Sequence, residues 1–230
     1  MNRNVLKIIA FVSMIVDHIG AVFFPNIIWF RVVGRIAMPI FAFFVAEGYF
    51  YTRNKVRYVL TLLGFMLIAW LPFCFGLGLP LYKINILGVF LISLLGMFLV
   101  DKLKNETRSK VLYVSLLILY FVCVFAIDIL GLIPEGVFGV SIPIVFYAFR
   151  DKKILKMVLA GVLLVVISLL VVLDNARVGL ENYYQFASLL AIIPICLYSG
   201  SKGKLRLKYL FYIGYPAHLG VLWILKLLII

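Results

Sequence analysis

Two side chains suited to acid–base chemistry, Asp17 and His18, lie next to each other inside an apolar segment of residues 5–24. In a lipid-embedded helix a charged side chain costs roughly 2.5 kcal/mol or more, so it needs a partner or a function. A carboxylate can fix a histidine and raise its basicity for proton transfer. Adjacent helical residues point about 100° apart, so we expect Asp17 to face another helix and not to bind His18.

Two arginines, Arg31 and Arg35, are one helical turn apart in the next apolar segment, residues 28–51. Counting 1.5 Å per residue puts Arg35 and His18 at a similar depth, about 20 Å from the basic ends of their segments. Guanidinium groups bind phosphates and developing oxyanions, and they also pair with buried carboxylates. The pattern leaves a ligand site and a structural ion pair with Asp17 both open, and Pro39 is expected to bend this helix.

The second histidine, His218, lies in the last apolar segment, residues 209–226, about 15 Å from its basic end. Both histidines are therefore expected inside the membrane, where hydrogen-bonded packing between helices is the alternative to chemistry. The basic stretch Gly200-Ser-Lys-Gly-Lys204, with Lys202 at its centre, suits phosphate binding, although it lacks the spacing of a P-loop.

The composition is that of a membrane protein. Hydrophobic residues make up 66% of the 230 residues and charged residues 13%, with a mean hydropathy of +1.18. These values exclude a water-soluble globular domain. No cleavage-site pattern precedes the polar pair, so we expect the first apolar segment to stay in the protein.

Nine apolar stretches have roughly the length of a membrane span. We predict an all-α polytopic helix bundle, a single domain over 1–230, with spans at residues 5–24, 28–51, 56–75, 84–100, 111–130, 137–149, 154–173, 183–198 and 209–226. The sixth stretch is short and contains Pro143, so a tilted, re-entrant or half-inserted helix is the alternative there.

The positive charges predict the orientation of these spans. Nearly all loop lysines and arginines lie in alternate loops, and the intervening loops carry only Lys83 and Arg177. Because Lys and Arg stay on the cytoplasmic side, we expect nine crossings with the N-terminus inside and the C-terminus outside. The net charge of +13 is then explained by these loops and by anionic lipid headgroups, without nucleic acid. The three cysteines have no paired spacing, so we expect neither disulfides nor a metal site.

Several stretches of the first apolar segments carry a resemblance to a known family: Lys7-Ile-Ile-Ala-Phe, Asp17-His18-Ile-Gly20, Arg31, Gly34-Arg35-Ile-Ala, Pro39-Ile-Phe-Ala-Phe, Ala46-Glu47-Gly48 and Thr52-Arg53. Looser matches continue through Asn85-Ile-Leu-Gly88, Tyr184-Gln185-Phe-Ala187, Tyr198-Ser-Gly200 and Tyr212 with Tyr215-Pro216-Ala-His218. In these stretches the chain resembles the TraX family, which is named for conjugal pilin acetylation.

This resemblance implies a multi-pass acetyltransferase of the bacterial cytoplasmic membrane, similar at a distance to polytopic acyltransferases that modify envelope sugars. The donor would be cytoplasmic acetyl-CoA, and the acceptor a membrane-associated pilin, peptide or glycan. By match, His18 is the expected catalytic base, supported by Asp17, with His218 a second candidate. Arg31, Arg35, Arg53 and Lys202 are the expected residues for the donor.

Two other classes of function fit the same residues. In a transporter or flippase, the buried charges would form a proton or anion path and the prolines would break helices. In a non-catalytic membrane assembly factor, the charges would only set the helix register.

Overall fold

The computed structural model describes residues 1–105, 109–133, 136–175, 180–201, 203–204 and 207–229, and every regular element in these residues is a helix. The elements are α1 (Arg3–Phe23), α2 (Ile28–Gly34), α3 (Ala37–Tyr51), α4 (Lys55–Leu77), α5 (Ile86–Asn105), α6 (Lys110–Ile129), α7 (Gly136–Ala148), α8 (Lys153–Asn175), the 3₁₀-helix η1 (Leu180–Ala191), α9 (Ile192–Cys196) and α10 (Lys208–Ile229). The all-helical prediction is confirmed.

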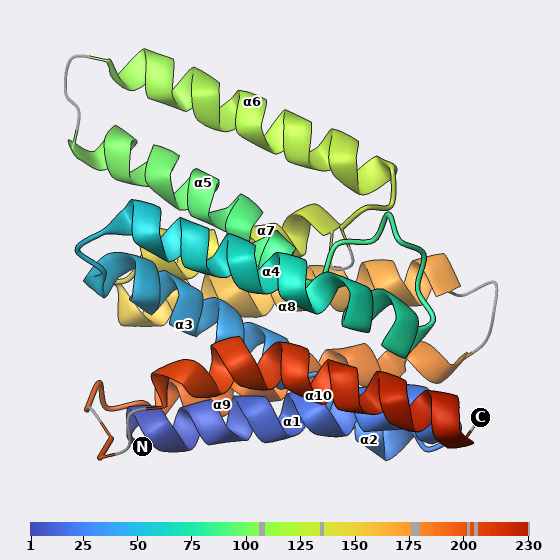
Figure 1. Cartoon of the computed structure of the whole chain (residues 1–230). Helices are drawn as coiled ribbons and strands as arrows, with labels where there is room; N and C mark the ends of the chain where they lie inside the picture. Colours follow the sequence, from blue (N-terminus) through green and yellow to red (C-terminus); the bar gives the residue numbers. More distant parts are fainter. Residues whose placement is uncertain (106–108, 134–135, 176–179, 202, 205–206, 230) are drawn as a thin grey trace. The chain divides into compact units, whose positions relative to one another are not determined.

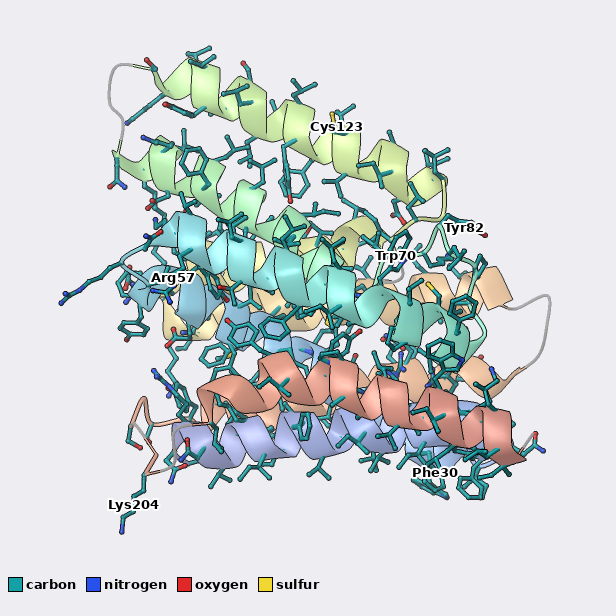
Figure 2. The ribbon with its side chains drawn as sticks, viewed as in Figure 1. Phe30, Arg57, Trp70, Tyr82, Cys123 and Lys204 are labelled. Carbon is teal, nitrogen blue, oxygen red and sulfur yellow. The ribbon has the colours of Figure 1, made fainter. Side chains whose placement is uncertain are left out.

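Seven helical stretches in the described residues are long and apolar enough to cross a membrane, and two further apolar stretches, Gly136–Ala148 and Tyr183–Cys196, are shorter. The chain is therefore a multi-pass membrane protein. Large apolar side chains on the outside of α6 support this conclusion, since Ile118, Val122 and Phe125 are each more than half exposed. Cys123 is exposed on the same helix (Figure 2). The count of nine crossings and their orientation stay predictions.

The second predicted span is two helices and not one. It is interrupted between α2 and α3, at Arg35 and Ile36. A proline has no N–H, so Pro39 cannot donate to the carbonyl of Arg35 as a helical residue would. Pro39 instead occupies the first turn of α3, where a missing donor is tolerated. The helix is interrupted one turn before Pro39, as expected, and the break falls at Arg35.

Two other spans differ from a full-length α-helix. Residues 183–198, predicted as a span, form most of the 3₁₀-helix η1 and the short helix α9. A 3₁₀-helix rises about 2.0 Å per residue, so it reaches farther than an α-helix of equal length. The sixth span is the α-helix α7, which is short as the sequence indicated, and Pro143 lies inside it without interrupting it.

Contacts between residues divide the chain into two compact units. The first contains Met1–Phe41, Leu67–Leu81 and Leu164–Ile230, and the second contains Ala42–Met66 and Tyr82–Leu163. In the first unit α1 packs against α2 and α10, and α2 packs against η1; in the second, α5 packs against α6 and α7 (Figure 1). All the residues of the site described next belong to the first unit, and the prediction of a single domain stays a prediction.

Candidate functional site

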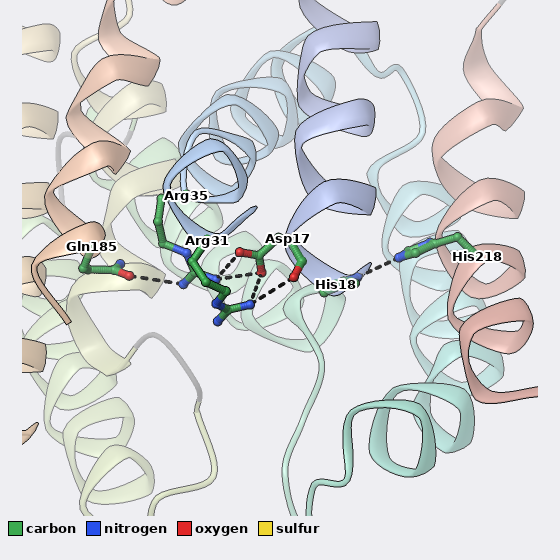
Figure 3. A network of polar contacts seen from close by, with 6 residues as sticks. All are labelled: Asp17, His18, Arg31, Arg35, Gln185 and His218. Atoms are coloured by element: carbon green, nitrogen blue, oxygen red, sulfur yellow. Dashed lines mark hydrogen bonds and ion pairs between the residues drawn. The ribbon is translucent and has the colours of Figure 1, made fainter. Parts of the chain in front are cut away.

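Asp17 on α1 accepts hydrogen bonds from two arginines (Figure 3). Arg35 Nη2 donates to its two carboxylate oxygens at 2.8 and 2.7 Å, and Arg31 Nη1 donates to Oδ2 at 2.8 Å and to the main-chain carbonyl of Asp17 at 3.2 Å. The Asp17 side chain is only 10% exposed. Asp17 thus faces the two arginines and not His18, as expected from the helical geometry. Of the two alternatives left open by the sequence, the structure contains the ion pair, and a ligand role for the arginines stays a prediction.

Glycines bring α1 and α2 close enough for these contacts. A β-carbon at Gly34 would overlap the carboxyl group of Asp17, and one at Gly20 would overlap the side chain of Phe30. A side chain at either position would push the two helices apart, because packed interiors have little spare volume. Gly34 therefore sets the distance at which Asp17 meets its arginines.

The 3₁₀-helix η1 adds contacts to the group formed by Asp17, Arg31 and Arg35, which we call the ionic cluster. Gln185 Oε1 accepts a hydrogen bond from Arg35 Nη1 at 3.1 Å, and the guanidinium carbons of Arg31 and Arg35 each lie 5.7 Å from the centre of the Tyr184 ring. An aromatic face attracts a cation at this distance. One carboxylate faces two guanidiniums, so Asp17, Arg31 and Arg35 together carry one surplus positive charge.

The two histidines form a second part of the site. His18 Nδ1 on α1 and His218 Nε2 on α10 are 2.7 Å apart, and the two rings are parallel to within 2°. His218 Nδ1 lies 2.9 Å from the main-chain oxygen of Gly214. Figure 3 shows His218 approaching from the side of His18 away from the arginines. The sequence predicted that both histidines lie in the membrane, but not that they meet.

The hydrogen-bond partners assign the protons of this pair. A carbonyl oxygen can only accept, so Nδ1 of His218 carries a hydrogen and Nε2 of His218, in the neutral ring, is an acceptor. His18 Nδ1 then donates to His218, which leaves Nε2 of neutral His18 as a basic nitrogen. The arrangement orients one imidazole with another, as a carboxylate orients the histidine in a catalytic triad.

Two other predicted site residues, Arg53 and Lys202, do not take part in the contacts described above. Arg53 is exposed in the turn between α3 and α4, within the second unit. Lys202 lies outside the described residues. Their role in donor binding stays a prediction. Tyr184 was not selected from the sequence, although it precedes Gln185 in one of the stretches that carry the family resemblance.

The sequence model of the TraX protein family matches residues 2–226, nearly the whole chain. The chain belongs to the TraX family. The match includes Asp17, Arg31, Arg35, Gln185 and both histidines, so the whole site lies within the TraX region.

Two curated relatives of this TraX-family chain match shorter stretches. A probable fimbrial assembly protein of Dichelobacter nodosus, FimC of serogroup H1, is 38% identical over 79 residues, 30% of this chain and 32% of that protein. An uncharacterized protein of Rickettsia prowazekii (strain Madrid E) is 40% identical over 58 residues, 25% of this chain and 23% of that protein. The chain thus spans a third or less of the length of these relatives. No solved structure matches it.

Proposed function

We propose that this TraX-family chain is a membrane acetyltransferase. It transfers an acetyl group from cytoplasmic acetyl-CoA to an amine or hydroxyl of a membrane-associated acceptor, in the cytoplasmic membrane of a bacterium. The single observation that carries this proposal is the hydrogen-bonded pair of His18 and His218, because it leaves a basic nitrogen on His18. A base of this kind is what acyl transfer to an amine or hydroxyl requires.

His18 is the general base of the proposed reaction. Its Nε2 takes the proton from the acceptor N–H or O–H as that atom attacks the thioester carbonyl carbon. The tetrahedral intermediate then collapses with cleavage of the carbon–sulfur bond, and the leaving thiolate takes the proton from the His18 imidazolium. The products are the acetylated acceptor and CoA, so protons and electron pairs balance without a metal or a redox partner.

His218 is the positioning residue for His18. Its Nδ1–H is held by the Gly214 carbonyl, and its Nε2 accepts from His18 Nδ1, which fixes the tautomer of His18 and the direction of its ring. When His18 becomes an imidazolium, this hydrogen bond becomes charge-assisted and stronger. This hydrogen bond therefore stabilises the imidazolium relative to a His18 that lacks the partner.

The ionic cluster supplies positive charge for the thioester carbonyl group. Arg31 and Arg35 exceed Asp17 by one charge, and that surplus favours the negative oxygen that develops on the thioester carbonyl. Asp17, Gln185 and the Tyr184 ring hold the two guanidiniums in place before the reaction, so little reorganisation is needed. Asp17 thus positions the arginines.

A pilin or peptide N-terminus is the acceptor that we favour. The support is the TraX family itself and the relative in Dichelobacter nodosus, which is named as a probable fimbrial assembly protein. An envelope glycan is the alternative acceptor, and it would use the same base and the same donor.

Release of CoA from acetyl-CoA by the purified protein in nanodiscs tests the proposal, with peptide amines and sugars added in turn. We expect turnover with one acceptor class and a loss of about 100-fold or more in His18→Gln, the range of general acid–base catalysis. Ser168→Ala is the matched control, because Ser168 on α8 is buried and its hydroxyl bonds only within its own helix, to Leu164. No turnover with any acceptor, together with no binding of acetyl-CoA, would refute the proposal.

The broken helix at Arg35 and Ile36 favours transport as the second candidate function, since transporters place ions at such breaks. Reconstituted vesicles separate the two functions. Anion or proton flux that persists in His18→Gln, without CoA release in the wild type, would replace the acetyltransferase by a transporter.

A further inference from the structure

We infer that the 3₁₀-helix η1 is a gate over the two arginines, and that it opens by changing into an α-helix. In the closed form, which the structure shows, η1 places Gln185 and Tyr184 on the two arginines. In the open form these two side chains leave the arginines, so that substrate can enter and product can leave. The two forms are inferred from contacts within the fold, and only the role of the gate rests on the proposed function.

The hydroxyl of Ser188 on η1 is buried without a partner. Ser188 is 2% exposed, and its hydroxyl oxygen makes no hydrogen bond with any residue that the structure describes. A buried polar group in this condition destabilises the state that contains it, and native folds rarely keep one without a reason. The oxygen itself is almost completely covered, so a substrate cannot bond to it while η1 stays as it is. Ser188 therefore indicates a second state, in which its hydroxyl has a partner.

Two other buried serines show which partner is missing. Ser93 on α5 and Ser168 on α8 are fully buried, and each hydroxyl donates to the main-chain carbonyl four residues earlier, at 3.0 and 2.7 Å. This is the usual bond of a serine inside an α-helix. The corresponding carbonyl for Ser188 is that of Tyr184.

The 3₁₀ geometry takes this carbonyl away from Ser188. An α-helix turns about 100° per residue, so the carbonyl four residues earlier is only about 40° away around the axis. A 3₁₀-helix turns about 120° per residue, which puts the same carbonyl about 120° away. In the α form of η1 the Ser188 hydroxyl donates to the Tyr184 carbonyl, as the hydroxyls of the other two serines do. A change of helix type thus gives the hydroxyl its partner.

The segment can adopt both helix types. The helix η1 has 12 residues, although 3₁₀-helices longer than three or four residues are uncommon. The α-helix α9 follows it directly, and residues 180–193 contain neither proline nor glycine. The ψ angles of the two helix types differ by only about 10–20° per residue. The α geometry of α9 can therefore extend into η1 without unfolding the segment.

Extension of the α-helix from α9 moves the residues that cover the arginines. Gln185 precedes Ile192, the first residue of α9, by 192 − 185 = 7 residues. With about 20° less turn and about 0.5 Å less rise per residue, Gln185 rotates by about 140° and shifts by about 3.5 Å. It then loses its 3.1 Å hydrogen bond from Arg35, and Tyr184 leaves with it. Figure 3 shows Gln185 and His18 on opposite sides of the arginines, so the gate opens on the side away from the proposed base.

Each form makes polar contacts that the other lacks. The closed form has the hydrogen bond from Arg35 to Gln185 and the Tyr184 ring near both guanidiniums, and the open form gains the hydrogen bond of the Ser188 hydroxyl. Removal of a contact that only one form makes therefore changes the ratio of the two forms. The proposed reaction needs the guanidiniums held in place, so catalysis belongs to the closed form and exchange of substrate and product to the open form.

The distance between two spin labels, measured by double electron–electron resonance in nanodiscs, tests for the two forms. The labels are attached at Tyr183→Cys on η1 and Val12→Cys on α1, because both side chains are more than half exposed. The exposed native cysteines, Cys123 and Cys196, are first changed to serine. A label at Tyr183 moves by on the order of 10 Å between the two forms. We expect two distances, one for each form.

Two variants should move the ratio of open to closed form in opposite directions. Ser188→Ala removes the bond that only the open form makes, and it should lower the ratio about fivefold. Gln185→Leu removes a charged hydrogen bond that only the closed form makes, and it should raise the ratio about tenfold or more. Ser168→Ala is the matched control in the same unit and should leave the ratio unchanged, because the Ser168 hydroxyl is bonded within α8. Saturating CoA should favour the closed form.

The outcomes separate this inference from the proposed function. A single distance in the wild type that persists in Gln185→Leu would overturn the two forms and leave the acetyltransferase standing. Equal ratios in Ser188→Ala and Ser168→Ala would overturn the role of the Ser188 hydroxyl. A ratio that CoA does not change, in a protein that binds CoA, would overturn the role of the gate. Absence of acetyl transfer by the wild type would overturn the proposed function, whereas two distances would still establish the two forms of η1.

Discussion

Replacing Asp17 with asparagine removes the one carboxylate of the ionic cluster while keeping its shape. The amide oxygen can still accept one hydrogen bond, but Arg31 and Arg35 then lose the negative charge of Asp17. Their side chains are only 23% and 16% exposed, so water cannot compensate well. We therefore expect Asp17→Asn to destabilise the first unit strongly.

The magnitude follows from the two ion pairs. Each pair of unit charges about 4 Å apart is worth about 4 kcal/mol at an effective dielectric constant of 20. Burial of the carboxylate itself costs several kcal/mol, which offsets about half of the two attractions. The expected loss in the free energy of unfolding is therefore about 3–5 kcal/mol, the range measured for removal of one partner of a buried pair.

Equilibrium unfolding in mixed detergent micelles measures this loss. Asp151→Asn is the matched control, because Asp151 pairs with Arg150 at 3.4 Å but is 82% exposed, and it should cost about 1 kcal/mol or less. Adding Arg31→Gln to Asp17→Asn removes one unpaired cation and should recover about 1–2 kcal/mol. Equal stability of Asp17→Asn and Asp151→Asn would refute the ion-pair reasoning.

Two further predictions address the close packing and the histidine pair. Gly34→Ala places a methyl group against the Asp17 carboxyl and should lower the free energy of unfolding by about 1–3 kcal/mol in the same assay. Gly220 has open space around it, so the control Gly220→Ala should change the free energy of unfolding by less than about 0.5 kcal/mol. His218→Gln keeps an acceptor for His18 Nδ1 and should lower kcat about tenfold. His218→Leu should lower kcat about 100-fold, because His18 loses its orienting partner. Equal losses of kcat in the two variants would contradict the positioning role of His218.

Several features of the site were predictable from local sequence. The cost of burying a charge singles out Asp17, Arg31 and Arg35 in any apolar segment, and the helical repeat predicts that Asp17 turns away from His18. The pairing of Asp17 with the arginines was one of two alternatives that the sequence left open, because guanidinium groups bind anionic ligands as well as carboxylates. Pro39 likewise predicts a distortion near Arg35, since a missing donor acts within one turn.

Other features depended on contacts between distant parts of the chain. Residues 183–198 have the apolar composition of an α-helix, but most of them form the 3₁₀-helix η1, which brings Tyr184 and Gln185 to the arginines. Helix type in such a segment is decided by packing against α2, and local propensity is too weak to predict it.

The sequence by itself determined the class of protein, the family and the membrane-embedded ionisable residues, because hydrophobicity and charge are properties of each residue and need no partner. Only the tertiary structure decided that His18 meets His218, 200 residues later, and that His218 is held in turn by Gly214. The meeting depends on the lateral packing of α1 against α10 and on the rotation of each helix about its axis. Neither is specified by hydrophobic length, since any rotation of an apolar helix satisfies its own backbone hydrogen bonds equally well.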